Sequence, residues 1–289
     1  MGRSRQFSAS GINVRVHTQH HWSEYVSLWN SLHALKRPIT HGPTALMIGD
    51  VKEVNDGSPE DGLYGYLYRF LNIDPNDPWF NIVAHKKATD KEVEEVSIPP
   101  ALKPNLKEIP YFFDVKKHRF YFIRKEKDGG VAPASVHRLF EKLTAAKSVK
   151  DRFQKVDITV LTEVGAVEAM LKWPVISSLT IHVERPNPND EEDDEAVFRR
   201  LRRRNVVSET HVYKKAPGAS SVTPDADMNR EAKVAANNGE VIVKGKNPQF
   251  QRDSASSTEF PMHINGQYDP NIQTLWQALI STVMAHQEK

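Results

Sequence analysis

The chain has 289 residues, of which 39% are hydrophobic and 26% charged, a composition that supports a folded core. Its formal net charge is only +2, so any binding of a polyanion must depend on a local basic surface. The absence of cysteine excludes disulfides, thiolate nucleophiles, Fe–S clusters and cysteine zinc sites. No apolar signal core opens the sequence and no apolar run reaches transmembrane length, so we expect a cytoplasmic protein without a membrane partner.

Hydrophobic periodicity predicts mostly strands in the first part of the chain. A helix with apolar residues at helical spacing follows the first strand and stops before Pro38. A second, short helix is expected near 90–95, inside a proline-rich stretch. Two strands around Lys116–His118 read as a hairpin. The predicted strands are 12–16, 45–54, 63–73, 111–115 and 120–124.

The second part of the chain alternates strands and helices more regularly. Gly239 is expected to cap the helix over 225–237, and the polar stretch 247–268 is expected to be a loop. The other predicted helices begin at Pro133, lie near 167–171, lie in the charged stretch and cover 272–283; the predicted strands are 156–162, 179–184, 209–213 and 240–244.

Together these elements predict the α+β class, with antiparallel or mixed sheets that are covered by helices and are compatible with ferredoxin-like elements. We expect two mixed halves. The first covers residues 1–130, and the second covers 131–289 and ends in an amphipathic helix.

The stretch 191–215 has the densest charge in the chain, with acidic residues followed by five arginines within six residues. A helical projection places Arg199, Arg200 and Arg203 on the outward face, where they could bind phosphate groups of a nucleic acid. The competing interpretation is a solvated helix whose charges complement the helix dipole. The further candidates for phosphate contacts are Lys214 and Lys215, which follow this helix, and the hairpin turn residues Lys116, Lys117 and Arg119.

Histidines cluster once, at His17, His20 and His21, between a predicted strand and a predicted helix. These are the candidates for acid–base catalysis, against the simpler interpretation of an ordinary polar loop. No acid with ligand spacing accompanies them, so we expect no metal site and no cofactor. Glu240 and Lys244 share one face of a predicted strand, without a second acid in a suitable place. No phosphate-loop, dinucleotide or nucleophile-elbow motif is present, which favours a protein without catalytic activity.

The order of elements resembles an uncharacterised bacterial family found near mobile elements, and its layout is distantly similar to the RexA phage-exclusion protein of lambda-type phages. The resemblance is carried by the turn Pro38–Thr40 after the first helix and by the successive strands 45–54 and 63–73. Later elements add to it: the strand 156–160, the helix to Trp173, the strand 179–183, and Val222-Thr223-Pro224 before the helix that ends at Asn237. It implies an anti-phage or mobile-element role with nucleic-acid binding and self-association. It transfers no catalytic residue.

The leading hypothesis is therefore a nucleic-acid-binding protein, DNA or RNA, that serves as the sensing component of a defence system. The alternatives are a metal-independent ribonuclease on a ferredoxin-like scaffold and a structural subunit that docks a partner protein of a defence operon. The apolar stripe of the last helix, from Ile272 to Val283, additionally predicts a homodimer if it faces outward.

Overall fold

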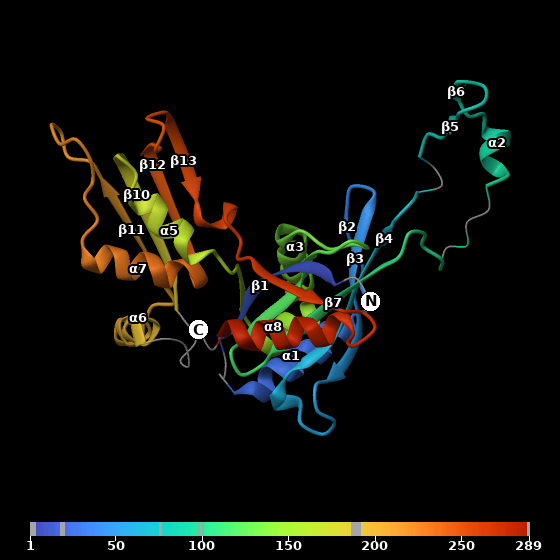
Figure 1. Cartoon of the computed structure of the whole chain (residues 1–289), viewed down its shortest axis with the longest axis horizontal. Helices are drawn as coiled ribbons and strands as arrows, with labels where there is room; N and C mark the ends of the chain where they lie inside the picture. The colour runs from blue at the N-terminus through green and yellow to red at the C-terminus, as the bar shows by residue number, and fades with distance from the viewer. Residues whose placement is uncertain are drawn as a thin grey trace.

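The structure is a computed structural model that describes residues 4–17, 21–74, 77–96, 99, 101–185 and 192–287. Helices and antiparallel sheets mix along the chain, which confirms the predicted α+β class. Two separate hydrophobic cores define two lobes that lie side by side, and a narrow arm projects from the first lobe (Figure 1).

The first lobe is built on an eight-stranded antiparallel sheet. Seven strands follow the order β14-β1-β8-β7-β4-β3-β2, and the eighth, β9, pairs with β1 outside this order. The long strand β1 pairs with β8 on one side, and with β14 and then β9 on the other. The strands are β1 (Arg5–Val16), β2 (Ile39–His41), β3 (Thr44–Glu53), β4 (Leu63–Leu71), β7 (Lys107–Asp114), β8 (Arg119–Lys125), β9 (Val156–Val160) and β14 (Ile264–Tyr268).

Aromatic packing fills the core of the first lobe. Trp29 is 1% exposed, and its ring centroid lies 5.0–5.4 Å from those of Tyr111, Phe113, Phe120 and Phe140. Its indole N–H donates to the Tyr111 hydroxyl at 3.1 Å, so the one polar group of the ring is satisfied. The helices of this lobe are α1 (Trp22–Ala34), α3 (Pro133–Thr144), α4 (Lys147–Phe153) and α8 (Leu275–Gln287).

The second lobe is inserted between β9 and β14 of the first lobe. Its core takes residues from Val167 to Ala255. The division expected at residue 130 falls between β8 and α3, and both of these elements pack in the first core. β9, β14 and α8 join that same core, although they come from the second half of the sequence.

The second lobe has one antiparallel sheet with the order β11-β10-β12-β13. Both β11 and β12 are antiparallel to β10, which lies between them, and α7 connects them. This is the split β–α–β arrangement of ferredoxin-like folds. The elements are α5 (Val164–Leu171), β10 (Val175–Glu184), α6 (Glu192–Arg203), β11 (Ser208–Lys214), α7 (Ala226–Asn237), β12 (Gly239–Lys246) and β13 (Arg252–Ser256).

The arm lies between β4 and β7 and consists of the small hairpin β5 (Phe80–Asn81) and β6 (Lys86–Lys87), followed by α2 (Asp90–Glu94) (Figure 1). The expected helix near 90–95 is therefore present. Apolar side chains at the hairpin tip face solvent, with Ile82 77% and Val83 93% exposed.

Two local predictions are wrong. The stretch 247–268 is not a loop, because it contains β13, β14 and the short 3-10 helix Ser257–Glu259. Gly239 does not cap α7; Asn238 is the cap, and Gly239 starts β12. A side chain at Gly239 would place its Cβ 2.0 Å from the His182 carbonyl oxygen, so glycine is needed here for the close approach to β10.

The apolar stripe of the last helix is used within the chain. Leu279 and Val283 are fully buried in the first core, and the Trp276 ring stacks on Tyr64 with centroids 4.3 Å apart. Ile272 precedes α8 and is 83% exposed. The homodimer stays a prediction. Most of the stripe that motivated it packs against the first lobe, and Ile272 is the exposed exception.

Candidate functional site: the open sheet face and the interlobe cleft

In the part of the chain that the structure describes, helices cover one face of the β10–β13 sheet and leave the other face open. Residues that lie directly opposite each other on neighbouring strands share a face. Leu179, Ile181 and Val243 are buried in the core with α5, α6 and α7. The alternate residues, which include Val212 (54% exposed) and Lys244, lie on the other face. We call this other face the open face.

One end of the open face is basic. Lys214 and Lys244 lie on either side of Ser178, and in the next row Lys246 lies directly opposite Arg252. All four cationic side chains are exposed, and within the described residues none of them forms an ion pair. Like charges directly opposite each other destabilise a sheet. The stability of this lobe therefore does not explain the arrangement.

The other end of the open face is formed by His182, Glu184 and Glu240. Nδ1 of His182 is 2.8 Å from the Thr210 hydroxyl, and Ser256 donates to Oε1 of Glu240 at 2.6 Å. Glu184 follows Ser178 on β10 by six residue steps, which places this end about 20 Å from the basic end.

A cleft of about 1190 Å³ begins at this second end. The second lobe lines it with His182, Glu184 and Glu240, and the first lobe lines it with residues of α3 and β9. On the first-lobe side, Nε2 of His137 lies 3.0 Å from the Ile158 carbonyl oxygen, and its Nδ1 lies 3.3 Å from Oε2 of Glu141. The open face and the cleft thus form one continuous surface.

Two carboxyl groups meet at the cleft, Asp157 from β9 of the first lobe and Glu184 from β10 of the second. They are hydrogen-bonded to each other, so they share a proton. Nζ of Lys155 lies 2.8 Å from Asp157 and 3.9 Å from Glu184, and His17 hydrogen-bonds the other oxygen of Asp157. Nε2 of His182 is 3.7 Å from Oε1 of Glu184.

The surroundings of the two carboxyl groups shift their pKa values in opposite directions. Burial, together with the hydrogen bond and the negative charge of Asp157, raises the pKa of Glu184 to about 7. Burial also acts to raise the pKa of Asp157, but its hydrogen bonds with His17, Glu184 and Lys155 outweigh this and hold its pKa below the ordinary value. Glu184 therefore gains and loses its proton near neutral pH, while Asp157 stays ionised.

A buried arginine lies beside this pair. Arg15 is 3% exposed and pairs in register with Asp157, and among the described residues its three guanidinium nitrogens have no hydrogen-bond partner. Burial lowers its pKa to about 10, which still leaves it charged at neutral pH. The guanidinium is thus held next to the carboxyl pair by the fold and not by hydrogen bonds of its own.

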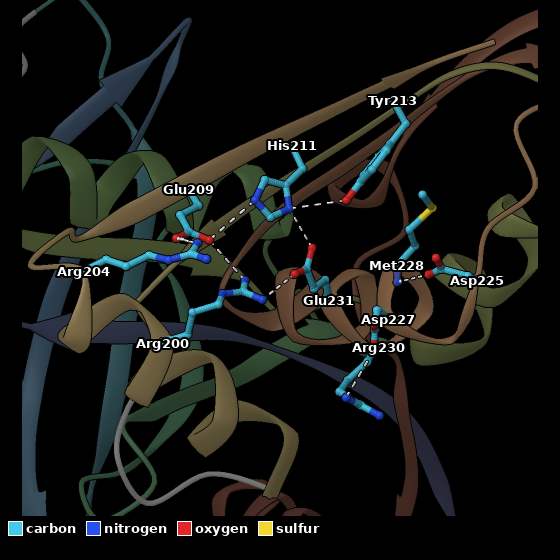
Figure 2. Close-up of polar contacts among 10 residues, drawn as sticks. All are labelled: Arg200, Arg204, Glu209, His211, Tyr213, Asp225, Asp227, Met228, Arg230 and Glu231. Atoms are coloured by element: carbon cyan, nitrogen blue, oxygen red, sulfur yellow. Dashed lines mark hydrogen bonds and ion pairs between the residues drawn. The ribbon is translucent and has the colours of Figure 1, made fainter. Parts of the chain in front are cut away.

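The charged helix α6 is held by a second polar network, shown in Figure 2. Arg200 lies between Glu231 of α7, at 2.5 Å, and Glu209 of β11, at 3.2 Å. Glu209 also pairs with Arg204, and the ring of His211 lies between the two glutamates. These contacts join α6 to both β11 and α7. Their role is to hold the lobe together.

The prediction that Arg200 points outward is wrong, because Glu209 and Glu231 bind it from other elements. Arg199 pairs with Glu195 one turn earlier at 2.9 Å, as its spacing suggests. Arg203 is exposed, but it lies on the helix layer of the lobe, away from the open face.

The predicted basic residues do not form one surface. Lys214 lies on the open face, whereas the side chain of Lys215 is turned to the Ala219 carbonyl oxygen. The hairpin turn belongs to the first lobe, where Lys116 pairs with Asp61 and Lys117 with Gln287. Arg119 is only partly exposed and hydrogen-bonds Tyr121.

The three candidate histidines differ in their surroundings. His17 contacts Asp157 at the cleft. His21 is the N-cap of α1 and accepts from the Ser23 backbone N–H. His20 lies outside the described residues. Of the two described candidates, His17 is the one that is connected to the cleft.

Within the described residues, no group of three or more His, Cys, Asp or Glu side chains is arranged to hold a metal ion. In the same part of the chain, no helix is long and apolar enough to cross a membrane.

Several residues of the site were not predicted as such. Asp157 is the second residue of β9 and Glu184 is the last residue of β10. Both strands have an ordinary alternating sequence, and no sequence pattern indicates that the two residues meet. The sequence predicts that Glu240 and Lys244 share one face of a strand, and in the structure both lie on the open face. Lys246 directly precedes the stretch 247–268, which the sequence pattern predicts to be a loop, and Arg252 lies inside that stretch.

The fold and the site define a two-lobed α+β protein with an open sheet face that leads into an interlobe cleft. Residues 5–284 match the model of a domain of unknown function, DUF4747, and the chain belongs to that family. No curated protein matches the chain.

Proposed function

We propose that this protein binds single-stranded nucleic acid on the open face. The observation that carries the proposal is the group of four exposed cations at the basic end, Lys214, Lys244, Lys246 and Arg252. Phosphate groups would supply the negative charge that the described part of the lobe does not place beside them.

The rest of the open face suits the sugar and phosphate groups of an extended strand. Hydroxyl side chains such as Ser178, Thr180 and Thr210 lie on it and can bond phosphate and sugar oxygens. Val212 adds exposed apolar surface for the bases. Lys244 and Lys246 lie about 7 Å apart along one strand. A sheet face of this kind favours an unpaired strand over a duplex, since unpaired bases can spread over a flat surface.

The anti-phage or mobile-element role stays a prediction that rests on the resemblance of the element order. A nucleic-acid sensor in such a system would need a surface like the open face. Docking of a defence partner protein is the competing prediction, and the charged helix that motivated it is neutralised in part by Glu209 and Glu231.

Fluorescence anisotropy with a short labelled single-stranded RNA, and with DNA of the same sequence, tests the proposal. The variant Lys214→Gln/Lys244→Gln/Lys246→Gln/Arg252→Gln keeps the length and polarity of the side chains but removes four charges. We expect it to lose at least about tenfold in affinity, because each lost phosphate contact weakens binding.

Arg202→Gln/Arg203→Gln is the matched control, because both arginines are exposed on α6 and neither forms an ion pair within the described residues. We expect nearly wild-type affinity for this variant. Loss of binding in the control, with binding retained in the variant of the open face, would move the binding surface to the charged helix and refute the proposal.

A further inference from the structure

The surface that carries the proposed function ends in a group of acid–base side chains. A strand bound at the basic end of the open face would reach the cleft after about 20 Å. There it would meet Glu184 on the wall formed by the second lobe and His137 on the wall formed by the first lobe. This inference rests on the proposed function and assigns chemistry to the cleft.

The ionisable groups at the cleft differ in whether they can exchange a proton near neutral pH. Glu184 exchanges a proton near neutral pH, because its pKa is raised by burial and by Asp157. Asp157 itself has both oxygens engaged, by Lys155 and by His17. Lys155 is half exposed and brings positive charge beside the two carboxyl groups.

His137 lines the cleft, and contacts at both of its ring nitrogens hold the ring in place. The contact of its Nε2 with the Ile158 carbonyl fixes the ring and directs the other nitrogen, Nδ1, toward Glu141 at the cleft. The wall of the second lobe therefore contributes a carboxyl group to the cleft, and the wall of the first lobe contributes an imidazole.

We propose that the cleft cleaves RNA, with Glu184 as the base that takes the proton of a 2′-hydroxyl group and His137 as the acid that protonates the leaving 5′-oxygen. The 2′-oxygen forms a bond to phosphorus while the bond from phosphorus to the 5′-oxygen breaks. The products are a 2′,3′-cyclic phosphate and a 5′-hydroxyl. Exchange with water then removes the proton from Glu184 and returns one to His137.

The remaining side chains position this pair. Lys155, which lines the cleft, offsets the negative charge that builds up on the phosphoryl oxygens, and the buried Arg15 adds positive charge beside the two carboxyl groups. His17 acts through Asp157, which it contacts, and is a positioning residue. RNA is the substrate class because its 2′-hydroxyl is an internal nucleophile, so that acid–base groups are sufficient for the step.

The test uses the full chain with end-labelled RNA, 2′-O-methyl RNA and DNA of one sequence, in the presence of a chelator. Binding and cleavage are measured on the same samples. We expect RNA to be cut to products with a cyclic phosphate, while 2′-O-methyl RNA is bound but not cut. The rising part of the pH–rate profile should lie near pH 7, where Glu184 loses its proton and becomes able to act as the base. The charged and titratable groups around Glu184 affect its pKa and therefore the pH of this rise in rate. They are Asp157, Lys155, Arg15 and His182.

Glu184→Gln should lower the rate by at least about 100-fold without changing the affinity for RNA. Glutamine can still donate to Asp157, so the variant keeps the contact between the lobes. His137→Asn is a second variant with the same expectation. Glu168→Gln, purified in the same way, controls for contaminating nuclease, since Glu168 pairs with Lys233 on the surface.

Some outcomes would overturn the catalytic assignment alone, and one would overturn the binding proposal with it. Wild-type protein that binds RNA without cutting it would remove the catalytic assignment and leave the proposed binding function intact. Cutting by Glu184→Gln at the wild-type rate, or cutting that stops with the chelator, would also remove it. Absence of RNA binding would overturn the proposed function and this inference together.

Discussion

Asp157 on β9 and Glu184 on β10 are hydrogen-bonded to each other where the two lobes meet. This contact joins the antiparallel sheet of the first lobe to that of the second. It depends on a proton, because two ionised carboxylates cannot hydrogen-bond to each other and would repel.

The first prediction concerns this proton. The pKa of Glu184 is raised from its ordinary value of 4.5 to about 7, so the folded protein holds a proton that the unfolded chain has already released. The stability that this proton contributes is complete below about pH 4.5 and is lost as the pH rises through about 7. The Glu184→Gln variant has no such proton. We therefore expect the melting temperature of the wild type to fall relative to that of Glu184→Gln between about pH 5 and pH 8.

The pKa of Asp157 is lowered, so its own contribution is lost only at acidic pH, below this window. Glu168→Gln is the control, and its difference from the wild type should not change with pH in this range. A constant difference between the wild type and Glu184→Gln across the window would show that the two carboxyl groups do not share a proton.

The second prediction concerns the network around Arg200. Glu231 is 11% exposed at its side chain and binds both Arg200 and His211. Glu231→Ala leaves these groups with Glu209 alone, and we expect the free energy of unfolding to fall by about 2 kcal/mol. Asp227→Ala, which removes an 84% exposed partner of Arg230 on the same helix, should cost under about 1 kcal/mol. Equal losses in a denaturant titration would show that the network does not hold α6, α7 and β11 together.

The third prediction concerns the aromatic core of the first lobe. Trp29→Ala removes a 1% exposed ring that contacts several aromatic neighbours, and we expect a loss of about 3–5 kcal/mol. Phe250→Ala removes a ring that is 65% exposed and should change the stability by less than about 0.5 kcal/mol. A small effect of Trp29→Ala in urea unfolding would contradict the packing described for this core.

Local sequence patterns predicted most elements correctly, because each depends on neighbouring residues. The hairpin around Lys116–His118 and the capped helix α2 are examples. The strands β13 and β14 were missed because their sequences are polar, and β13 is an edge strand whose first three residues are exposed. A polar edge strand has the composition of a loop.

The site could not be derived from the sequence for a different reason. A helical projection finds only partners on the same helix, so it identified Glu195 beside Arg199 and missed Glu209 and Glu231 beside Arg200. Asp157 and Glu184 come from different lobes. Their contact arises because the chain leaves the first sheet after β9 and returns to it at β14.

The most direct test of nucleic-acid binding by the open face is a salt titration of the affinity for a labelled single strand. A plot of the logarithm of the binding constant against the logarithm of salt concentration has a slope of about −0.7 for each phosphate contact to a single strand. The variant that neutralises Lys214, Lys244, Lys246 and Arg252 should therefore have a slope shallower by about 3 than the wild type. Identical slopes for the two proteins would show that these four side chains do not contact phosphates and would contradict the proposed function.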